Sequence, residues 1–112
     1  MRWSPAILRV SASIILALIA PHASASPADR GLAFARAHCG RCHAVGPRRT
    51  SPMREAPSFR TLADHFPVGD LADLLVEGVD RRHPAMPDFR LTPADAADLT
   101  AYLEGLRHGR RP

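Results

Sequence analysis

Two stretches of the chain carry apolar residues at the spacing of an amphipathic helix. One begins near residue 27, and the other extends from residue 93 to residue 106. In each stretch apolar side chains recur every three or four residues, which places them on one face of a helix. These positions are Leu32, Ala35 and Cys39 in the first stretch and Leu99, Tyr102, Leu103 and Leu106 in the second.

The same capping pattern marks the start of both helices. Ser26 and Thr92 are each followed by proline and, three residues on, by aspartate. Serine and threonine suit the N-cap, and proline suits the first helical position. An acidic side chain is favoured near the positive end of the helix dipole. We therefore expect one helix to begin after Ser26 and another after Thr92.

The middle of the chain predicts one further helix and a shorter helical turn. Asp70 suits the cap of a short helix that Gly78 would end. A turn is expected around residues 58–65, whereas residues 46–57 and 78–91 have the composition of loops. No stretch alternates for long enough to predict a strand, so the predicted fold class is all-α with three to four helices. The leucines of the short helix are Leu71, Leu74 and Leu75, of which the last two are expected in the core.

The beginning of the chain has the organisation of a secretory signal peptide. Two arginines among the first nine residues precede an apolar run over residues 10–20, and Ala23-Ser24-Ala25 supplies a cleavage motif. The apolar run is shorter than the roughly 20 residues that span a bilayer. We expect residues 1–25 to be removed. Residues 26–112 would then form one domain without a transmembrane span in the periplasm, an oxidising compartment.

Charge and cysteine content narrow the function classes. The 87 residues from Ser26 onward carry 13 arginines and 11 acidic residues, a net charge of +2. This small charge gives no reason to expect a nucleic acid as a partner. The chain has 2 cysteines, too few for a disulfide-stabilised scaffold. A domain of this size would gain stability from an additional group in its core.

The sequence Cys39-Gly40-Arg41-Cys42-His43 is the attachment motif of c-type haem. On a helical turn both thiols face one side, where each can form a thioether to a haem vinyl group. His43 then offers a ring nitrogen to the iron as an axial ligand. Three alternatives are less well supported than one covalently attached haem. A thioredoxin-like redox pair lies near strands, a zinc site has four ligands, and a disulfide across so short a loop adds little stability.

The second axial ligand is expected from the loop before the last helix. Met86 lies in the sequence His83-Pro84-Ala85-Met86-Pro87, where two prolines restrict the backbone and present the thioether at a small ordering cost. It follows His43 by 43 residues, enough chain to reach the opposite face of the haem. His83 is the main rival. The other candidates, more simply explained as surface or packing residues, are Met53, His38, His65 and His108.

The early motif, the proline-flanked Met86 and the terminal helices together resemble the small monohaem class I cytochromes c of bacterial periplasms. The resemblance implies a cytochrome c-like fold, with helices wrapped around one haem. It also implies that the first and last helices cross where a glycine packs against an aromatic residue, and Gly31 and Tyr102 fit these places. It further implies that the Pro57 carbonyl accepts a hydrogen bond from His43, which would orient this ligand and raise its donor strength.

With His43 and Met86 both bound, the iron would have no vacant position for a substrate. We therefore expect a periplasmic single-electron carrier rather than an enzyme, a monomer that meets donor and acceptor redox proteins. Two alternatives remain open: a dedicated electron-transfer subunit of a larger periplasmic dehydrogenase complex, and a haem enzyme or sensor with an open iron site. Arg41, Arg48 and Arg49 fit either the rim of a weak docking surface or a solvated loop.

Overall fold

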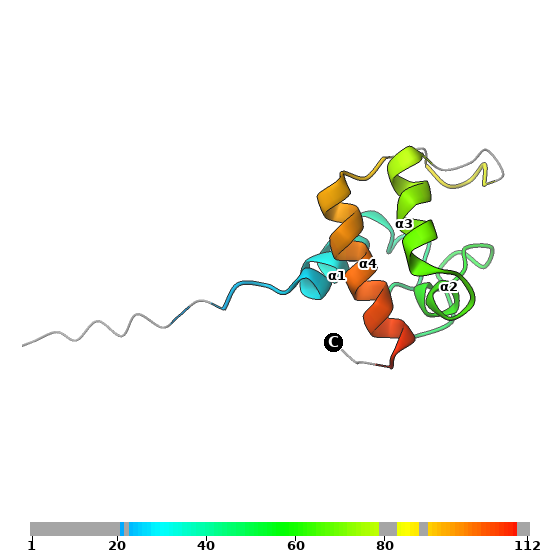
Figure 1. Ribbon diagram of the computed structural model, residues 1–112. Coiled ribbons are helices and arrows are strands. Elements are labelled where there is room, and N and C mark those ends of the chain that lie inside the picture. The colour runs from blue at the N-terminus through cyan, green and yellow to red at the C-terminus, as the bar shows by residue number, and fades with distance from the viewer. Residues whose placement is uncertain (1–20, 22, 79–82, 88–89, 110–112) are drawn as a thin grey trace, which may run out of the picture.

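The computed structural model describes residues 21, 23–78, 83–87 and 90–109. The all-α prediction is confirmed, because the described residues contain helices and no strand. α4 packs against each of the other three helices. The helices are α1 (Pro27–His38), α2 (Phe59–His65), α3 (Val68–Glu77) and α4 (Pro93–Arg107) (Figure 1).

α1 and α4 begin where the capping pattern predicts. The Ser26 hydroxyl accepts a hydrogen bond from the Asp29 N–H (3.1 Å), and the Asp29 carboxylate accepts one from the Ser26 N–H (3.1 Å). In α4 the Thr92 hydroxyl accepts from the Asp95 N–H (3.2 Å). These bonds satisfy donors that the first turn of a helix otherwise leaves unpaired. Local sequence therefore defines the start of both helices.

The turn expected at residues 58–65 is confirmed as the helix α2. The Ser58 hydroxyl caps it by accepting from the Thr61 N–H (3.1 Å). Ser58 is almost fully buried, so this hydrogen bond also satisfies a polar group within the core. The cap fixes the position of Phe59, the first residue of α2, whose ring packs into the core.

The start of α3 corrects a prediction. This helix begins at Val68 after Pro67, so Asp70 lies within the first turn, and its prediction as the cap is wrong. Pro67 has the φ of −60° that suits a helix start, and its carbonyl accepts from the Leu71 N–H (3.3 Å). The helix ends at Gly78 as predicted, where a φ of +113° favours glycine.

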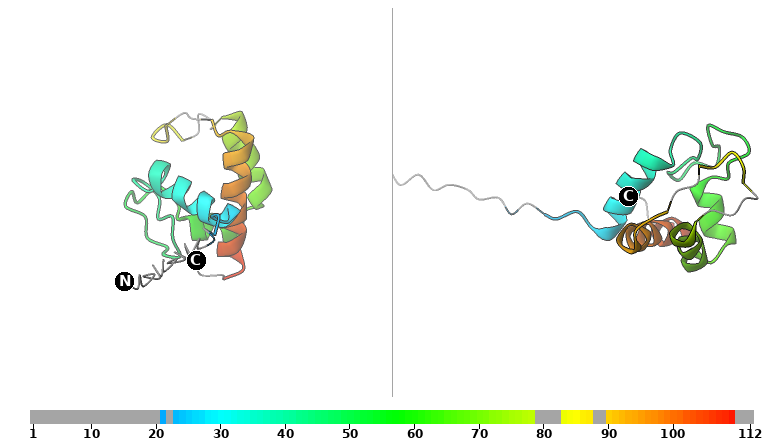
Figure 2. Two further views of the ribbon diagram at one scale, coloured as in Figure 1. Left: turned by 90° about the vertical axis from the view of Figure 1, so that its left-hand side faces the viewer. Right: turned by 90° about the horizontal axis from the view of Figure 1, so that it is seen from above.

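α1 and α4 cross in direct backbone contact at Gly31. A β-carbon at this position would lie 2.1 Å from the carbonyl oxygen of Asp98 and 3.0 Å from the nitrogen of Leu99. Only glycine therefore lets the two backbones approach this closely. Figure 2 shows α1 lying across α4. The expected glycine is in place, but its nearest neighbours are backbone atoms. Tyr102 lies one turn further along α4 and is buried.

An ion pair beside Gly31 joins the two helices at their crossing. The Arg30 guanidinium donates from Nε and Nη2 to the two carboxylate oxygens of Asp98, at 2.7 Å each. Its third nitrogen, Nη1, donates to the Ala25 carbonyl at 2.8 Å. The hydrogen bond from Arg30 holds the pKa of Asp98 below its ordinary value of 3.8. The pair thus links α1 to α4 in a manner that depends on pH.

We expect the free energy of unfolding of Asp98→Asn to decrease less in acid than that of the wild type. A carboxyl group whose pKa is lower in the folded chain stabilises it above the unfolded pKa, and this contribution disappears as the pH falls through the folded pKa. The free energy of unfolding of the wild type should therefore fall more steeply than that of the variant below pH 3.8, the ordinary value. Urea unfolding at a series of acidic pH values measures both curves. Glu55→Gln, at an exposed loop carboxylate, should keep the wild-type curve, whereas parallel curves for Asp98→Asn would contradict the expectation.

All four helices contribute side chains to one core. Leu32 comes from α1, Phe59 from α2 and Val68 from α3, while α4 supplies Leu99 and Leu106. Both of the α4 leucines are 1% exposed, so α4 is the central element of the core. The face predicted from the spacing of its leucines is confirmed as the buried one.

α3 also carries apolar surface that the core does not cover. Core positions were expected for Leu74 and Leu75, but Leu74 is 52% exposed, so that expectation is wrong for Leu74. α3 buries Val68 and Ala72 instead. At about 3.6 residues per turn, a side chain two positions beyond Ala72 points to nearly the opposite side of the helix. Leu75 is half-buried and packs against the edge of the core.

The part of the chain that the structure describes holds no helix of the length and apolar character needed to cross a membrane. Most of the expected signal peptide, residues 1–20 and 22, lies outside the described residues. So do residues 79–82 and 88–89 of the loop expected before the last helix.

Candidate functional site

The motif from Cys39 to His43 forms a tight turn at the C-terminal end of α1. The Cys39 N–H donates to the Ala35 carbonyl (2.8 Å), and the N–H groups of Cys42 and His43 both donate to the Cys39 carbonyl (3.2 and 3.0 Å). The last of these bonds has the spacing of an α-helix. Both cysteines are half-buried and have free thiols. One short segment therefore supplies two thiols and an imidazole.

The surroundings of Cys39 favour the protonated thiol. Burial raises the pKa of this thiol to about 11, because desolvation penalises the thiolate. Thiol–disulfide exchange uses the thiolate, so the pKa of this thiol is shifted away from that of a reactive redox cysteine. Among the residues that the structure describes, no three or more histidine, cysteine, aspartate or glutamate side chains are grouped so that they could hold a metal ion, whereas a structural zinc site has four ligands.

The His43 imidazole is oriented by the loop before α2. Its Nδ1 lies 2.7 Å from the Pro57 carbonyl oxygen. Because a carbonyl oxygen only accepts, Nδ1 carries the proton, and Nε2 keeps its lone pair. The Phe59 ring lies beside the imidazole, with ring centroids 5.6 Å apart. His43 thus presents one defined nitrogen that can bind a metal.

Residues 42–45, which we call the His43 segment, are bonded to the loop that follows them. The Cys42 carbonyl accepts from the Met53 N–H (3.1 Å). The Ala44 carbonyl accepts from the Phe59 N–H (2.9 Å). These two bonds lie on either side of His43 and tie its backbone to the loop at Met53 and to the start of α2 at Phe59.

Two side-chain hydroxyls also bond to the His43 segment. The Ala44 N–H donates to the Ser51 hydroxyl oxygen (3.0 Å). The Tyr102 hydroxyl donates to the Val45 carbonyl. The sequence pattern predicted Tyr102 on the apolar face of the last helix but did not indicate Ser51, because no periodicity marks a serine within a loop.

Met86, the expected second ligand, lies in a short turn before α4. Its N–H donates to the His83 carbonyl (2.9 Å), and its side chain is half-buried whereas His83 is exposed. After the turn the chain returns to α3, where the Leu91 N–H donates to the Leu75 carbonyl (2.9 Å). The hydrogen bonds of the described residues do not connect Met86 to the His43 segment.

The other ligand candidates occupy ordinary positions. The exposed His38 packs its ring on Phe34, with centroids 4.4 Å apart. His108 follows α4 and lies 3.5 Å from a Glu104 carboxylate oxygen. His65 is the last residue of α2 and is exposed. These surroundings suit surface histidines.

Arginines dominate the surface near the motif. The stretch from residue 36 to residue 54 contains five arginines and no acidic residue. Arg41 and Arg48 are exposed, while Arg49 pairs with the Asp64 carboxylate of α2 (2.8 Å). This pair also holds the pKa of Asp64 below its ordinary value, chiefly through the hydrogen bond from Arg49.

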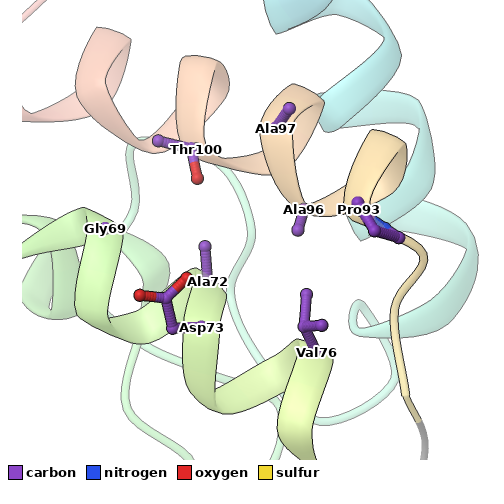
Figure 3. A pocket seen from close by; sticks show the side chains of 8 residues that line it. All are labelled: Gly69, Ala72, Asp73, Val76, Pro93, Ala96, Ala97 and Thr100. Carbon is purple, nitrogen blue, oxygen red and sulfur yellow. The ribbon is translucent and has the colours of Figure 1, made fainter.

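A shallow groove of about 340 Å³ lies between α3 and α4, beside their contact (Figure 3). Its walls are mostly small side chains, including Ala72 and Val76 of α3 and Ala96 of α4. Asp73 is the charged residue among those that line it. None of the motif residues lines it. The groove is therefore separate from the His43 cluster.

Most of the chain, including the motif from Cys39 to His43, is similar to known proteins. Residues 26–103 match the family described as cytochrome c oxidase, cbb3-type, subunit III. The chain is 33% identical over 98 residues to cytochrome c-552 of Bradyrhizobium diazoefficiens, covering 84% of this chain and 90% of the relative. No solved structure gives a significant match.

Proposed function

Because the chain belongs to the cytochrome c family of electron-carrying haem proteins, we propose that it is a periplasmic single-electron carrier with one covalently attached haem. In this proposal Cys39 and Cys42 form the thioethers, and His43 and Met86 are the axial ligands. The observation that carries it is the turn at the end of α1. There two thiols lie beside an imidazole whose Nδ1 is held on the Pro57 carbonyl at 2.7 Å.

The residues present fit a haem at this position. Cys39 and Cys42 offer free thiols within one turn, as attachment to two vinyl groups requires. His43 offers an Nε2 whose lone pair is free, because its other nitrogen donates to Pro57. The set of donor atoms thus agrees with the family's cofactor.

The roles of the side chains follow from their chemistry. When bound, haem supplies an iron centre that changes by one electron. The Pro57 carbonyl, by accepting from Nδ1, makes His43 a stronger donor and stabilises the oxidised state. The Met86 thioether is a weaker donor and favours the reduced state. With His43 and Met86 both holding the iron, the protein would transfer electrons without binding a substrate there.

The exposed arginines near the motif support docking of acidic redox partners. Arg41 lies within the motif itself, and Arg48 follows it in the same loop. Exposed charges of this kind speed encounter and orient the partner, while contributing little to a lasting complex. A carrier must also dissociate, so a surface held by exposed charges suits its task.

The proposed ligation is tested by the absorption spectra of wild type and Met86→Ala. We expect sharp c-type bands in the reduced wild type and a weak far-red band in the ferric form, typical of a methionine ligand. The far-red band should disappear in Met86→Ala, because the thioether is lost. Met53→Ala is the matched control and should keep the band.

Other results would contradict His43/Met86 ligation. A far-red band that survives in Met86→Ala, or disappears in Met53→Ala, would exclude Met86 as the ligand. A wild type without this band whose low-spin spectrum changes in His83→Ala would assign the position to His83. A high-spin wild type that binds carbon monoxide readily would indicate a haem enzyme or sensor.

A further inference from the structure

The backbone on the C-terminal side of His43 is held by two hydroxyl groups from distant parts of the chain. The Ser51 hydroxyl accepts from the Ala44 N–H at 3.0 Å. The Tyr102 hydroxyl, from α4, donates to the carbonyl of Val45. The hydrogen bonds of these two hydroxyls go to Ala44 and Val45, the two residues that follow His43, and not to the imidazole itself.

We propose that Ser51 and Tyr102 are positioning residues for His43, which keep its Nδ1 on the Pro57 carbonyl and thereby set the reduction potential. This inference rests on the proposed function, since it assigns His43 as the axial ligand. It assigns to each hydroxyl a role in the electronic properties of the site in addition to its role in folding.

The Ser51 hydroxyl fixes the peptide that joins His43 to Ala44. The N–H of this peptide donates to Ser51, and the Ala44 carbonyl on the next peptide accepts from the Phe59 N–H at 2.9 Å. Both the N–H and the carbonyl of Ala44 are therefore hydrogen-bonded. Removing the hydroxyl leaves a half-buried N–H without its partner, which costs free energy until the segment moves or water enters.

The Tyr102 hydroxyl links the same segment to the most buried helix. Tyr102 is 3% exposed, and its neighbours Leu99 and Leu106 on α4 are 1% exposed. Burial raises the pKa of the phenol, so it remains protonated and able to donate at neutral pH. α4 thus acts as a rigid support for Val45.

If the His43 segment moved, the hydrogen bond between His43 Nδ1 and the Pro57 carbonyl would lengthen. Pro57 lies on a separate part of the loop, directly before the cap of α2, so the 2.7 Å distance depends on how the two backbones are held together. A longer bond leaves the proton more firmly on Nδ1 and makes Nε2 a weaker donor. A weaker donor stabilises oxidised iron less, and the reduction potential rises.

The test compares holoproteins carrying Ser51→Ala, Ser51→Thr, Tyr102→Phe and Thr50→Ala. Thr50, the exposed neighbour of Ser51, is the matched control. Each sample is measured for reduction potential, for the exchange rate of the His43 Nδ1 proton by NMR, and for the free energy of unfolding. We expect Ser51→Ala and Tyr102→Phe to raise the potential and to speed the exchange. Ser51→Thr should restore both, and Thr50→Ala should leave both unchanged.

The outcomes separate positioning from a merely structural role. If Ser51→Ala and Tyr102→Phe lower only the free energy of unfolding, with potential and proton exchange at wild-type values, the inference is wrong while the proposed function stands. A shift in potential without faster proton exchange would likewise overturn it, because the effect would not pass through Nδ1. Absence of covalently bound haem from the wild type would contradict the proposed function and the inference together.

Discussion

Replacing both Cys39 and Cys42 with serine is expected to abolish covalent haem attachment completely. These are the 2 cysteines of the chain, and a hydroxyl does not replace a thiol in thioether formation. Any haem that the double variant retains through His43 is held by coordination alone. Extraction with acidified acetone should therefore remove all haem from the variant and none from the wild type. Intact-protein mass spectrometry should show the loss of one haem mass.

The single variants control for misfolding. Cys39→Ser and Cys42→Ser should each keep one thioether, and hence haem that resists extraction, although with lower yield. Haem that stays attached to the double variant would refute the assignment of these residues. Wild-type protein purified from a host that attaches haem but lacking a covalent haem would refute the proposed cofactor.

Gly31→Ala is expected to destabilise the protein by about 3 kcal/mol or more, the upper range for overpacking. The added β-carbon would lie 2.1 Å from the Asp98 carbonyl oxygen and 2.6 Å from its carbonyl carbon, both backbone atoms of α4. A backbone cannot yield as a flexible side chain can, so the two helices must separate. The same movement would strain the bidentate pair between Arg30 and Asp98. Denaturant unfolding of the holoprotein measures the loss.

Gly105→Ala is the matched control within α4. A β-carbon there meets nothing within 4 Å. This variant should be more stable than the wild type by about 0.5–1 kcal/mol, because alanine has the higher helix propensity. If Gly31→Ala and Gly105→Ala give similar unfolding curves, the backbones of α1 and α4 are not in direct contact at Gly31.

Local chemistry explains which parts of the fold could be predicted from the sequence. Ser26 and Thr92 bond to residues three positions away, so their pattern is visible in the chain itself. Both Pro67 and Asp70 could mark the start of α3, and Asp70 is the residue with a side chain that can cap a helix. The helix nevertheless begins after Pro67, which provides no side-chain hydrogen bond.

The remaining differences come from contacts that periodicity does not encode. Leu74 belongs to an apolar pattern on α3, but the pattern alone does not show which side of the helix faces α4. Ser51 bonds to Ala44 across seven residues of loop, where no repeat predicts a pairing. The motif from Cys39 to His43 was visible because its chemistry requires fixed spacing within one turn.

The crossing of α1 and α4 has a consequence for how the chain folds. Arg30 and Asp98 are 68 positions apart, so the contact that buries α1 joins the two ends of the domain. α1 has 12 residues, a length at which an isolated helix is marginal in water. Until α4 has been synthesised, α1 therefore has no partner to stabilise it. Stable folding awaits the last helix, and until then the thiols of the motif remain on an open and accessible segment.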